Sequence, residues 1–138
     1  MQVVSSFMQA LAIHKIKVVP FIDDMDTAYT WADLVISRAG AMSVTEICTV
    51  GVAAIYIPFP QAVDDHQTHN CKPVVAANGA LMLAQKDLTA VKIQDLLQDF
   101  VTDRERLLAM AINARQLARP KASETLAEAC KQYYWSQS

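Results

Sequence analysis

Short runs of apolar residues alternate along the chain with longer segments in which apolar residues recur every three or four positions. The short runs predict strands at residues 16–21, 34–37, 52–57 and 80–83. The runs at 34–37 and 52–57 are almost wholly apolar, as parallel strands covered on both faces should be. The pattern therefore predicts an α/β fold: an open parallel Rossmann-like sheet with flanking helices.

The longer segments predict the crossover helices of this sheet. Their ends are marked by capping residues, Ser, Thr or Asp at the start and Gly just beyond the end. Residues 1–15 are expected to form a separate apolar helical segment, and residues 16–138 one domain. The predicted helices run from Asp23 or Asp24 to Trp31, from Ser43 to a cap at Gly51, from about 64 to 78 with a bend at Pro73 and an end at Gly79, from Thr89, from 102 or 103 to 118, and from Ser123 onward.

Composition narrows the class of protein. The 138 residues are 53% hydrophobic and 19% charged, with a formal net charge of -2, which is typical of a well-packed globular domain. Lys and Arg are scattered, so no basic stripe is available for nucleic acid. Three cysteines without Cys-x-x-Cys spacing argue against a disulfide framework or a zinc knuckle. Without a signal peptide or a run long enough to span a bilayer, a cytosolic location is expected.

The segment 37–46, Ser-Arg-Ala-Gly-Ala-Met-Ser-Val-Thr-Glu, is a candidate anion site. A buried strand leads through a glycine turn into a helix whose first backbone N–H groups have no partner, a geometry that suits a diphosphate. Ser43 could add a hydroxyl, and Glu46 could accept hydrogen bonds from the two hydroxyls of a ribose. Arg38 could neutralise phosphate or pair with an acidic neighbour.

A purely structural interpretation competes with this one. Ser43 and Glu46 have the spacing of a capping box, in which Ser43 would bond the N–H of Glu46 and Glu46 would reach back to the helix start. Both roles can coexist only if Glu46 leaves the cap when a ligand arrives.

The segment 64–70, Asp-Asp-His-Gln-Thr-His-Asn, opens a helix at the same sheet edge. Its side chains His66, Gln67 and Asn70 offer donors and acceptors suited to sugar hydroxyls, and Asp64 or Asp65 would cap the helix. A metal site at His66 and His69 would need a third ligand that the sequence does not supply. A polar, solvated helix start is the remaining alternative.

The segment 21–25, Phe-Ile-Asp-Asp-Met, carries two aspartates after a strand. Such a pair is typical of the acidic pocket of a response-regulator receiver, but the later strands lack the isolated Asp and the Lys-Pro that a receiver requires. Helix capping by Asp23 or Asp24 is the simpler interpretation.

Three segments, 21–25, 31–41 and 64–70, occur in the order and spacing of the MurG family, which the chain resembles over about residues 16–135. The family comprises bacterial UDP-N-acetylglucosamine:undecaprenyl-diphospho-muramoyl-pentapeptide N-acetylglucosaminyltransferases. The resemblance implies the donor-binding, C-terminal half of a two-domain GT-B glycosyltransferase, which adds N-acetylglucosamine to lipid I to make lipid II. It also implies that the full-length enzyme lies at the cytoplasmic face of the membrane and that it requires no metal or cofactor.

The resemblance implies roles for single residues. The backbone of Ile22 would read uracil, the turn at 41–43 would meet the diphosphate, and Glu46 would accept from the ribose. His66 and Gln67 would contact the sugar. The full set of substrate-binding residues expected from the family's motifs is Ile22, Arg38, Ala41, Met42, Ser43, Glu46, His66, Gln67 and Asn70.

The chain departs from the pattern of the family in two ways. Ala53 stands where the family usually has proline. The acceptor-binding domain and the first strand with its Gly-rich loop are expected to be absent, so no catalytic residue is expected here, and the chain alone should bind without turnover. Alternatives are a donor subunit that finds its acceptor half in a separate chain, or a non-catalytic nucleotide-sugar or receiver-like module. An unpaired sheet edge would favour self-association.

Overall fold

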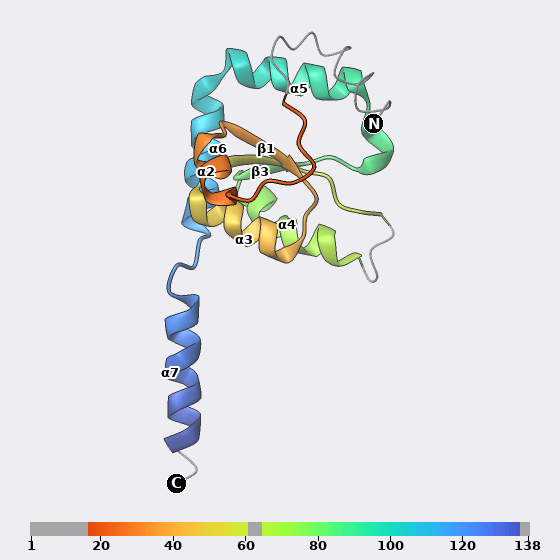
Figure 1. Cartoon of the computed structure of the whole chain (residues 1–138). Helices are drawn as coiled ribbons and strands as arrows, with labels where there is room; N and C mark the ends of the chain where they lie inside the picture. The colour runs from red at the N-terminus through yellow and green to blue at the C-terminus, as the bar shows by residue number, and fades with distance from the viewer. Residues whose placement is uncertain (1–16, 61–64, 136–138) are drawn as a thin grey trace.

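The computed structural model describes residues 17–60 and 65–135 (Figure 1). Within these ranges, three parallel strands lie side by side in the order β1 (Leu34–Ser37), β2 (Ala53–Tyr56) and β3 (Ala80–Met82). The register places Leu34 opposite Ala53 and Ala54 opposite Ala80. The prediction of an open parallel sheet is confirmed, and the carboxyl ends of β1 and β2 meet at one edge.

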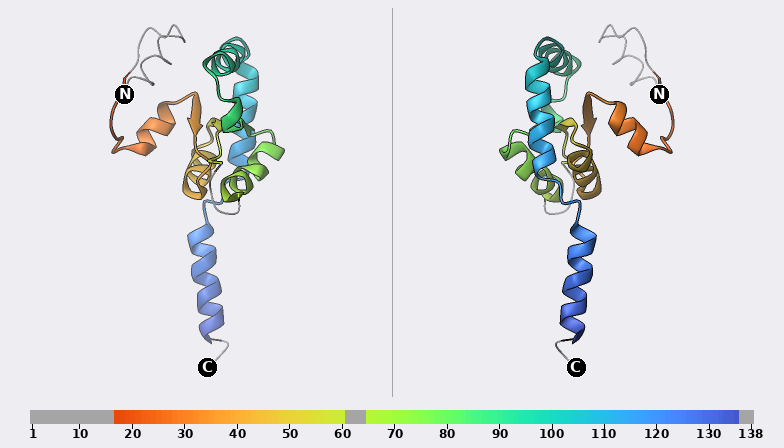
Figure 2. Two further views of the ribbon diagram at one scale, coloured as in Figure 1. Left: turned by 90° about the vertical axis from the view of Figure 1, so that its right-hand side faces the viewer. Right: turned by 90° about the vertical axis from the view of Figure 1, so that its left-hand side faces the viewer.

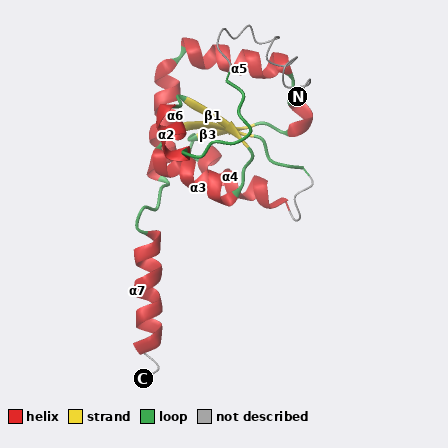
Figure 3. Ribbon diagram, in the orientation of Figure 1, coloured by secondary structure: helices red, strands yellow, loops and turns green. Residues whose placement is uncertain are grey.

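Helices connect and cover these strands (Figure 3). Their ends agree with the predicted ones to within a few residues, and Pro73 lies inside α4, which continues across it. The helices are α2 (Met25–Trp31), α3 (Ala41–Val50), α4 (His66–Ala76), α5 (Ala90–Thr102), α6 (Arg104–Gln116) and α7 (Ala122–Trp135), with a 3-10 turn, η2 (Gln85–Asp87), after β3.

The central strand β2 is buried on both faces. Ala54 and Tyr56 pack into one core with α2, α3 and α4, whereas Ala53 and Ile55 pack into a second core with α5 and α6. Alternate residues of a strand point to opposite faces of the sheet, so a fully covered strand must be apolar throughout. This arrangement is the physical reason for the continuous apolar run at 52–57.

Local capping fixes several helix ends. The side chains of Thr89 and Asp103 accept hydrogen bonds from the N–H groups three residues on, and Gly51 adopts the left-handed conformation (φ 79°) that ends α3. The end of α4 differs from the prediction. The left-handed residue there is Asn78, not Gly79, and the Gly79 N–H donates to the Val74 carbonyl at 2.8 Å.

The predicted strand at 16–21 does not form in the residues that the structure describes. Lys17 to Asp24 precede α2 without a strand partner, and Val18 and Phe21 are 62% and 75% exposed. Apolar composition makes an extended segment possible, but a strand exists only by hydrogen bonding to a neighbour. The free edge of β1 is not paired with this segment.

The helix α7 projects from the body of the domain in both views of Figure 2, with residues 122–134 exposed. Within the described part of the chain, no helix combines the length and the apolarity needed to cross a membrane. The helix predicted near the N-terminus lies outside the described residues.

Candidate functional site

Two of the three polar motifs of the sequence, 37–46 and 64–70, follow the carboxyl ends of β1 and β2, whereas the third, 21–25, precedes α2. The turn 38–40 leaves β1 and enters α3, and the chain that leaves β2 reaches α4 shortly afterwards. Ligands of open α/β sheets bind at this edge because loops, rather than packed helices, surround the strand ends.

The first turn of α3 has no side-chain cap. Gly40 is its N-cap (φ -64°, ψ 147°), and the Gly40 carbonyl accepts from the Val44 N–H at 3.0 Å. The amides of Ala41, Met42 and Ser43 come before the first hydrogen bond within the helix, so their N–H groups remain directed outward. Together they carry the partial positive charge of a helix start, which favours an anion.

The capping-box interpretation of Ser43 and Glu46 is wrong. Because α3 begins at Ala41, two residues earlier than predicted, Ser43 is the third helical residue and not the cap. Glu46 lies a further turn along the exposed face of the helix. Its carboxylate is therefore not occupied at the helix start.

Gly40 keeps the space over this helix start open. A Cβ atom built on Gly40 would meet only the Ser43 Oγ, at 3.8 Å, which is an ordinary contact. The φ of Gly40 is one that any residue adopts. Nothing among the described residues packs there in a way that requires glycine, so the absent side chain leaves room for a bound group to approach the backbone.

Glu46 is held by a residue from another helix. The Tyr29 hydroxyl donates to Glu46 Oε2 at 3.3 Å, joining α2 to α3. Burial, followed by the nearby Glu46 carboxylate, raises the pKa of Tyr29, so its hydroxyl stays protonated at neutral pH. Sequence reasoning assigned Tyr29 only to the core or a pocket wall. No local pattern connects residues 17 positions apart.

Arg38 is engaged with the loop that follows β2. Its Nη1 donates to the carbonyls of Ile57 at 3.1 Å and Pro58 at 3.4 Å, and its guanidinium lies 5.3 Å from the centre of the Phe59 ring. These contacts differ from the predicted acidic neighbour. A guanidinium with five donors can fix this loop and still offer N–H groups elsewhere.

The start of α4 is tied to both neighbouring loops. Gln67 Oε1 accepts from the Phe59 N–H at 2.9 Å, and Asn70 Nδ2 donates to the Ala39 carbonyl at 3.0 Å. His66 is exposed at the first residue of the helix. Arg38, Gln67 and Asn70 thus connect the turn before α3, the loop after β2 and α4 into one hydrogen-bonded unit.

The predicted cap of α4 is only partly as expected. Asp65 occupies the N-cap position in the left-handed conformation (φ 54°), but its side chain makes no capping hydrogen bond. Asp64 lies outside the described residues. His69 Nδ1 contacts the Asp65 carbonyl at 3.0 Å. Among the residues described, no group of three metal-ligating side chains is close enough together to hold an ion.

The segment before α2 holds Ile22, which is 44% exposed. Asp24 caps α2, accepting from the Thr27 N–H at 2.9 Å and from the Thr27 hydroxyl at 2.6 Å. These two hydrogen bonds lower the pKa of the Asp24 carboxyl. The capping interpretation of this aspartate is confirmed.

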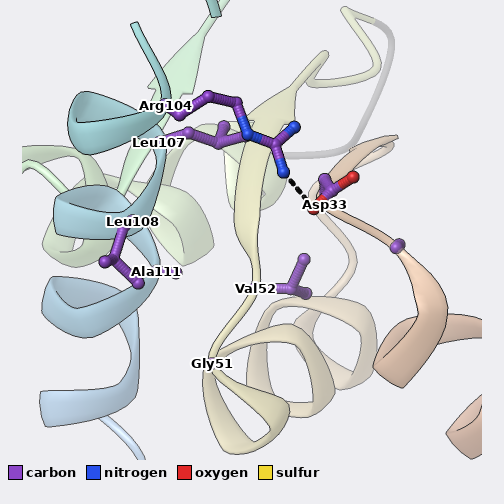
Figure 4. A pocket seen from close by; sticks show the side chains of 8 residues that line it. Asp33, Gly51, Val52, Arg104, Leu107, Leu108 and Ala111 are labelled. Carbon is purple, nitrogen blue, oxygen red and sulfur yellow. Dashed lines mark hydrogen bonds and ion pairs between the residues drawn. The ribbon is translucent and has the colours of Figure 1, made fainter. Parts of the chain in front are cut away.

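A pocket lies at the other end of the strands (Figure 4), with a volume of about 350 Å³. Asp33 and Arg104 pair across it at 2.9 Å, over an apolar floor that includes Val52 and Leu107. Both charged side chains are well exposed and satisfy each other, so the pair contributes at most about 1 kcal/mol. None of the predicted site residues lines this pocket.

Comparison with known proteins places residues 1–126 in the family model described as the glycosyltransferase family 28 C-terminal domain. The chain is 52% identical over 111 residues to the UDP-N-acetylglucosamine--N-acetylmuramyl-(pentapeptide) pyrophosphoryl-undecaprenol N-acetylglucosamine transferase of Marinobacter nauticus, covering 80% of this chain and 31% of the relative. It is 48% identical over 118 residues to the Coxiella burnetii protein of the same name, covering 86% of this chain and 33% of that one.

A solved structure agrees with these relatives. The fold superposes on a crystal structure of Acinetobacter baumannii MurG with a TM-score of 0.78 and 42% sequence identity, over 86% of this chain and 34% of that one. The chain therefore spans about a third of the length of the proteins it matches.

Proposed function

Because the chain belongs to the glycosyltransferase family 28 C-terminal domains, as the MurG enzymes do, we propose that it binds UDP-N-acetylglucosamine at the carboxyl ends of β1 and β2. The observation that carries the proposal is the uncapped start of α3 beneath the open space at Gly40. The amides of Ala41, Met42 and Ser43 suit a diphosphate, which needs several N–H donors and positive charge.

The remaining contacts that we propose are those that the motifs of the family imply. Glu46, exposed and oriented by Tyr29, accepts hydrogen bonds from the ribose hydroxyls. The backbone of Ile22 contacts the uracil. His66 and Gln67 contact the N-acetylglucosamine, with Gln67 also fixed on the Phe59 N–H. Arg38 and Asn70 support the site through the loops that they join.

The acceptor would be bound elsewhere. We propose that a lipid-linked acceptor is held by an acceptor domain, fused or on a partner chain, at the cytoplasmic face of the membrane, and that the product is lipid II. Transfer requires both substrates to be held in a reactive geometry. The 138 residues alone should then bind the donor without transferring its sugar.

Removal of the Glu46 carboxylate tests the donor site. Glu46→Ala is expected to lower the affinity for UDP roughly 10- to 100-fold, because a hydrogen bond to a charged group contributes about 1.5–3 kcal/mol. Titration calorimetry of the full 138-residue chain with UDP gives the affinity. Glu124→Ala, which changes an exposed glutamate on α7, is the control and should bind like the parent. Equal affinities for the parent and Glu46→Ala would refute the ribose contact.

Tyr29→Phe tests whether orientation of Glu46 matters. Loss of the 3.3 Å hydrogen bond leaves the carboxylate in place but frees it, so affinity for UDP should fall about 2- to 10-fold. Since the raised pKa of Tyr29 keeps its hydroxyl protonated, this difference between Tyr29→Phe and the parent should be constant from pH 6 to 8. In the Glu46→Ala background, Tyr29→Phe should have no further effect on binding; an additive loss would show that Tyr29 acts independently.

A further inference from the structure

The pocket in Figure 4 lies at the amino ends of the strands, between α6 and the residues that precede β1 and β2. Its volume of about 350 Å³ is at the lower end of the range of small-molecule pockets, roughly 300–1,000 Å³. The floor is aliphatic and is formed by Val52, Leu107, Leu108 and Ala111. The pocket therefore has the size and the apolar surface to hold a small ligand with an aliphatic group.

Two opposite charges face each other over this floor. Arg104 Nη2 and Asp33 Oδ1 are 2.9 Å apart, and the two side chains are 63% and 68% exposed. A guanidinium has five N–H donors and a carboxylate has two oxygens, so this contact uses only part of either group. Because an exposed ion pair adds little to stability, the pair can open with little loss and offer both charges to a ligand.

The pocket continues along α6 into a second cavity of about 340 Å³. The two cavities share Gly51, Leu108 and Ala111 as lining residues, and the second also contacts Val50 and Ile112. Leu108 and Ile112 are 61% and 51% exposed, although both side chains are large and apolar. An aliphatic group that extends from the charged end of the pocket would cover them and gain from their removal from water.

We propose that this pocket binds a small zwitterion, a free α-amino acid with a branched aliphatic side chain. Its carboxylate accepts hydrogen bonds from Arg104, its ammonium group donates to Asp33, and its side chain lies on the floor toward Ile112. A ligand with a single charge leaves one member of the opened ion pair without a partner, so the pocket requires both charges. No residue of the proposed donor site lines this pocket, so the inference does not depend on that site.

NMR titration of the full 138-residue chain with L-leucine, N-acetyl-L-leucine and L-leucinamide tests the class of ligand. Leucine at millimolar concentration should shift the amide signals of Asp33, Val52 and Ala111. N-acetyl-leucine lacks the ammonium group and leucinamide lacks the carboxylate, so each should bind at least about 10-fold more weakly. Equal affinities for the three ligands, or no shifts with leucine, would overturn the proposal.

Two conservative substitutions assign the charges. Arg104→Gln should weaken leucine binding at least about 10-fold without weakening leucinamide, which has no carboxylate to lose a partner. Asp33→Asn should weaken leucine binding by a similar factor without weakening N-acetyl-leucine. Arg106→Gln is the matched control: this exposed arginine packs on the Phe100 ring and does not line the pocket, so all three affinities should match those of the parent.

The affinity for UDP separates this pocket from the proposed donor site. It should be the same in the parent, Arg104→Gln and Asp33→Asn, because the changes lie at the opposite end of the strands. Failure of the parent to bind UDP would refute the donor site and leave the leucine result to decide this pocket. Equal weakening of leucine and leucinamide by Arg104→Gln would refute the contact between Arg104 and the carboxylate.

Discussion

Gly40→Asp is expected to abolish UDP binding while leaving the fold at least as stable as before. Aspartate is a favoured N-cap, and a negative charge at a helix start is stabilising, so the free energy of unfolding should rise by about 0.3–1 kcal/mol. The backbone angles of Gly40 suit it, and a Cβ there meets only the Ser43 Oγ at 3.8 Å. The substitution gives α3 the side-chain cap that it lacks.

The same side chain closes the proposed ligand site. Its carboxylate would accept the amide hydrogen bonds that we assign to the diphosphate, and it would repel the negative ligand. Like charges about 4 Å apart near a protein surface repel by about 4 kcal/mol, so affinity should fall by more than about 100-fold. Calorimetry with UDP measures the affinity, and urea unfolding followed by circular dichroism measures the stability.

Gly40→Asn distinguishes the effect of the added negative charge from the effect of a side chain that occupies the proposed diphosphate site. It caps the helix without adding charge, so it should also bind UDP poorly but less poorly than Gly40→Asp. UDP binding at parental affinity by Gly40→Asp, in a folded protein, would rule out the start of α3 as the diphosphate site.

Gly79→Ala is expected to have the largest effect on stability. A Cβ at Gly79 would lie 2.7 Å from the Ala114 nitrogen and 2.9 Å from its Cα. These are backbone atoms of α6, which packs on β2 and on α3, so they cannot move aside without separating layers of the core. Overpacking of this kind costs about 1–3 kcal/mol, a large share of the 5–15 kcal/mol typical of a folded domain.

The urea midpoint of Gly79→Ala should therefore fall well below that of the parent. Gly40→Ala is the matched control, because the same added methyl group meets only the Ser43 Oγ, at an ordinary contact distance of 3.8 Å. It should lower the free energy of unfolding by no more than about 1 kcal/mol, because alanine is a poorer helix cap than glycine. Equal midpoints for the two variants would contradict the close approach of Gly79 to α6.

The elements of the fold could be predicted because their signals are local. Apolar runs marked β1, β2 and β3, and the caps Asp24, Thr89 and Asp103 marked helix starts to within a residue or two. The start of α3 was misplaced by two residues because Ser43 and Glu46 have capping-box spacing, while the actual cap is a glycine with no side chain to reveal it.

The proposed site was predicted in outline for a related reason. Parallel strands bring their carboxyl ends to one edge, so the motifs after β1 and β2 had to lie near each other. The family resemblance then supplied roles that spacing alone left open between capping and binding. The sequence could not show which side chains hold the loops of the site in place. It indicated only which side chains could contact a ligand.

By itself the sequence determined an α/β chain of parallel strands and capped helices, with the motifs that follow β1 and β2 at one sheet edge, because hydrophobic periodicity and capping act over a few neighbouring residues. Only the tertiary structure decided that Tyr29 donates a hydrogen bond to Glu46, that Asn70 donates one to the Ala39 carbonyl, and that residues 17–21 pair with no strand in the described part of the chain. Each of these outcomes depends on which groups from distant parts of the chain come within hydrogen-bonding distance, and that geometry exists only once the core has packed.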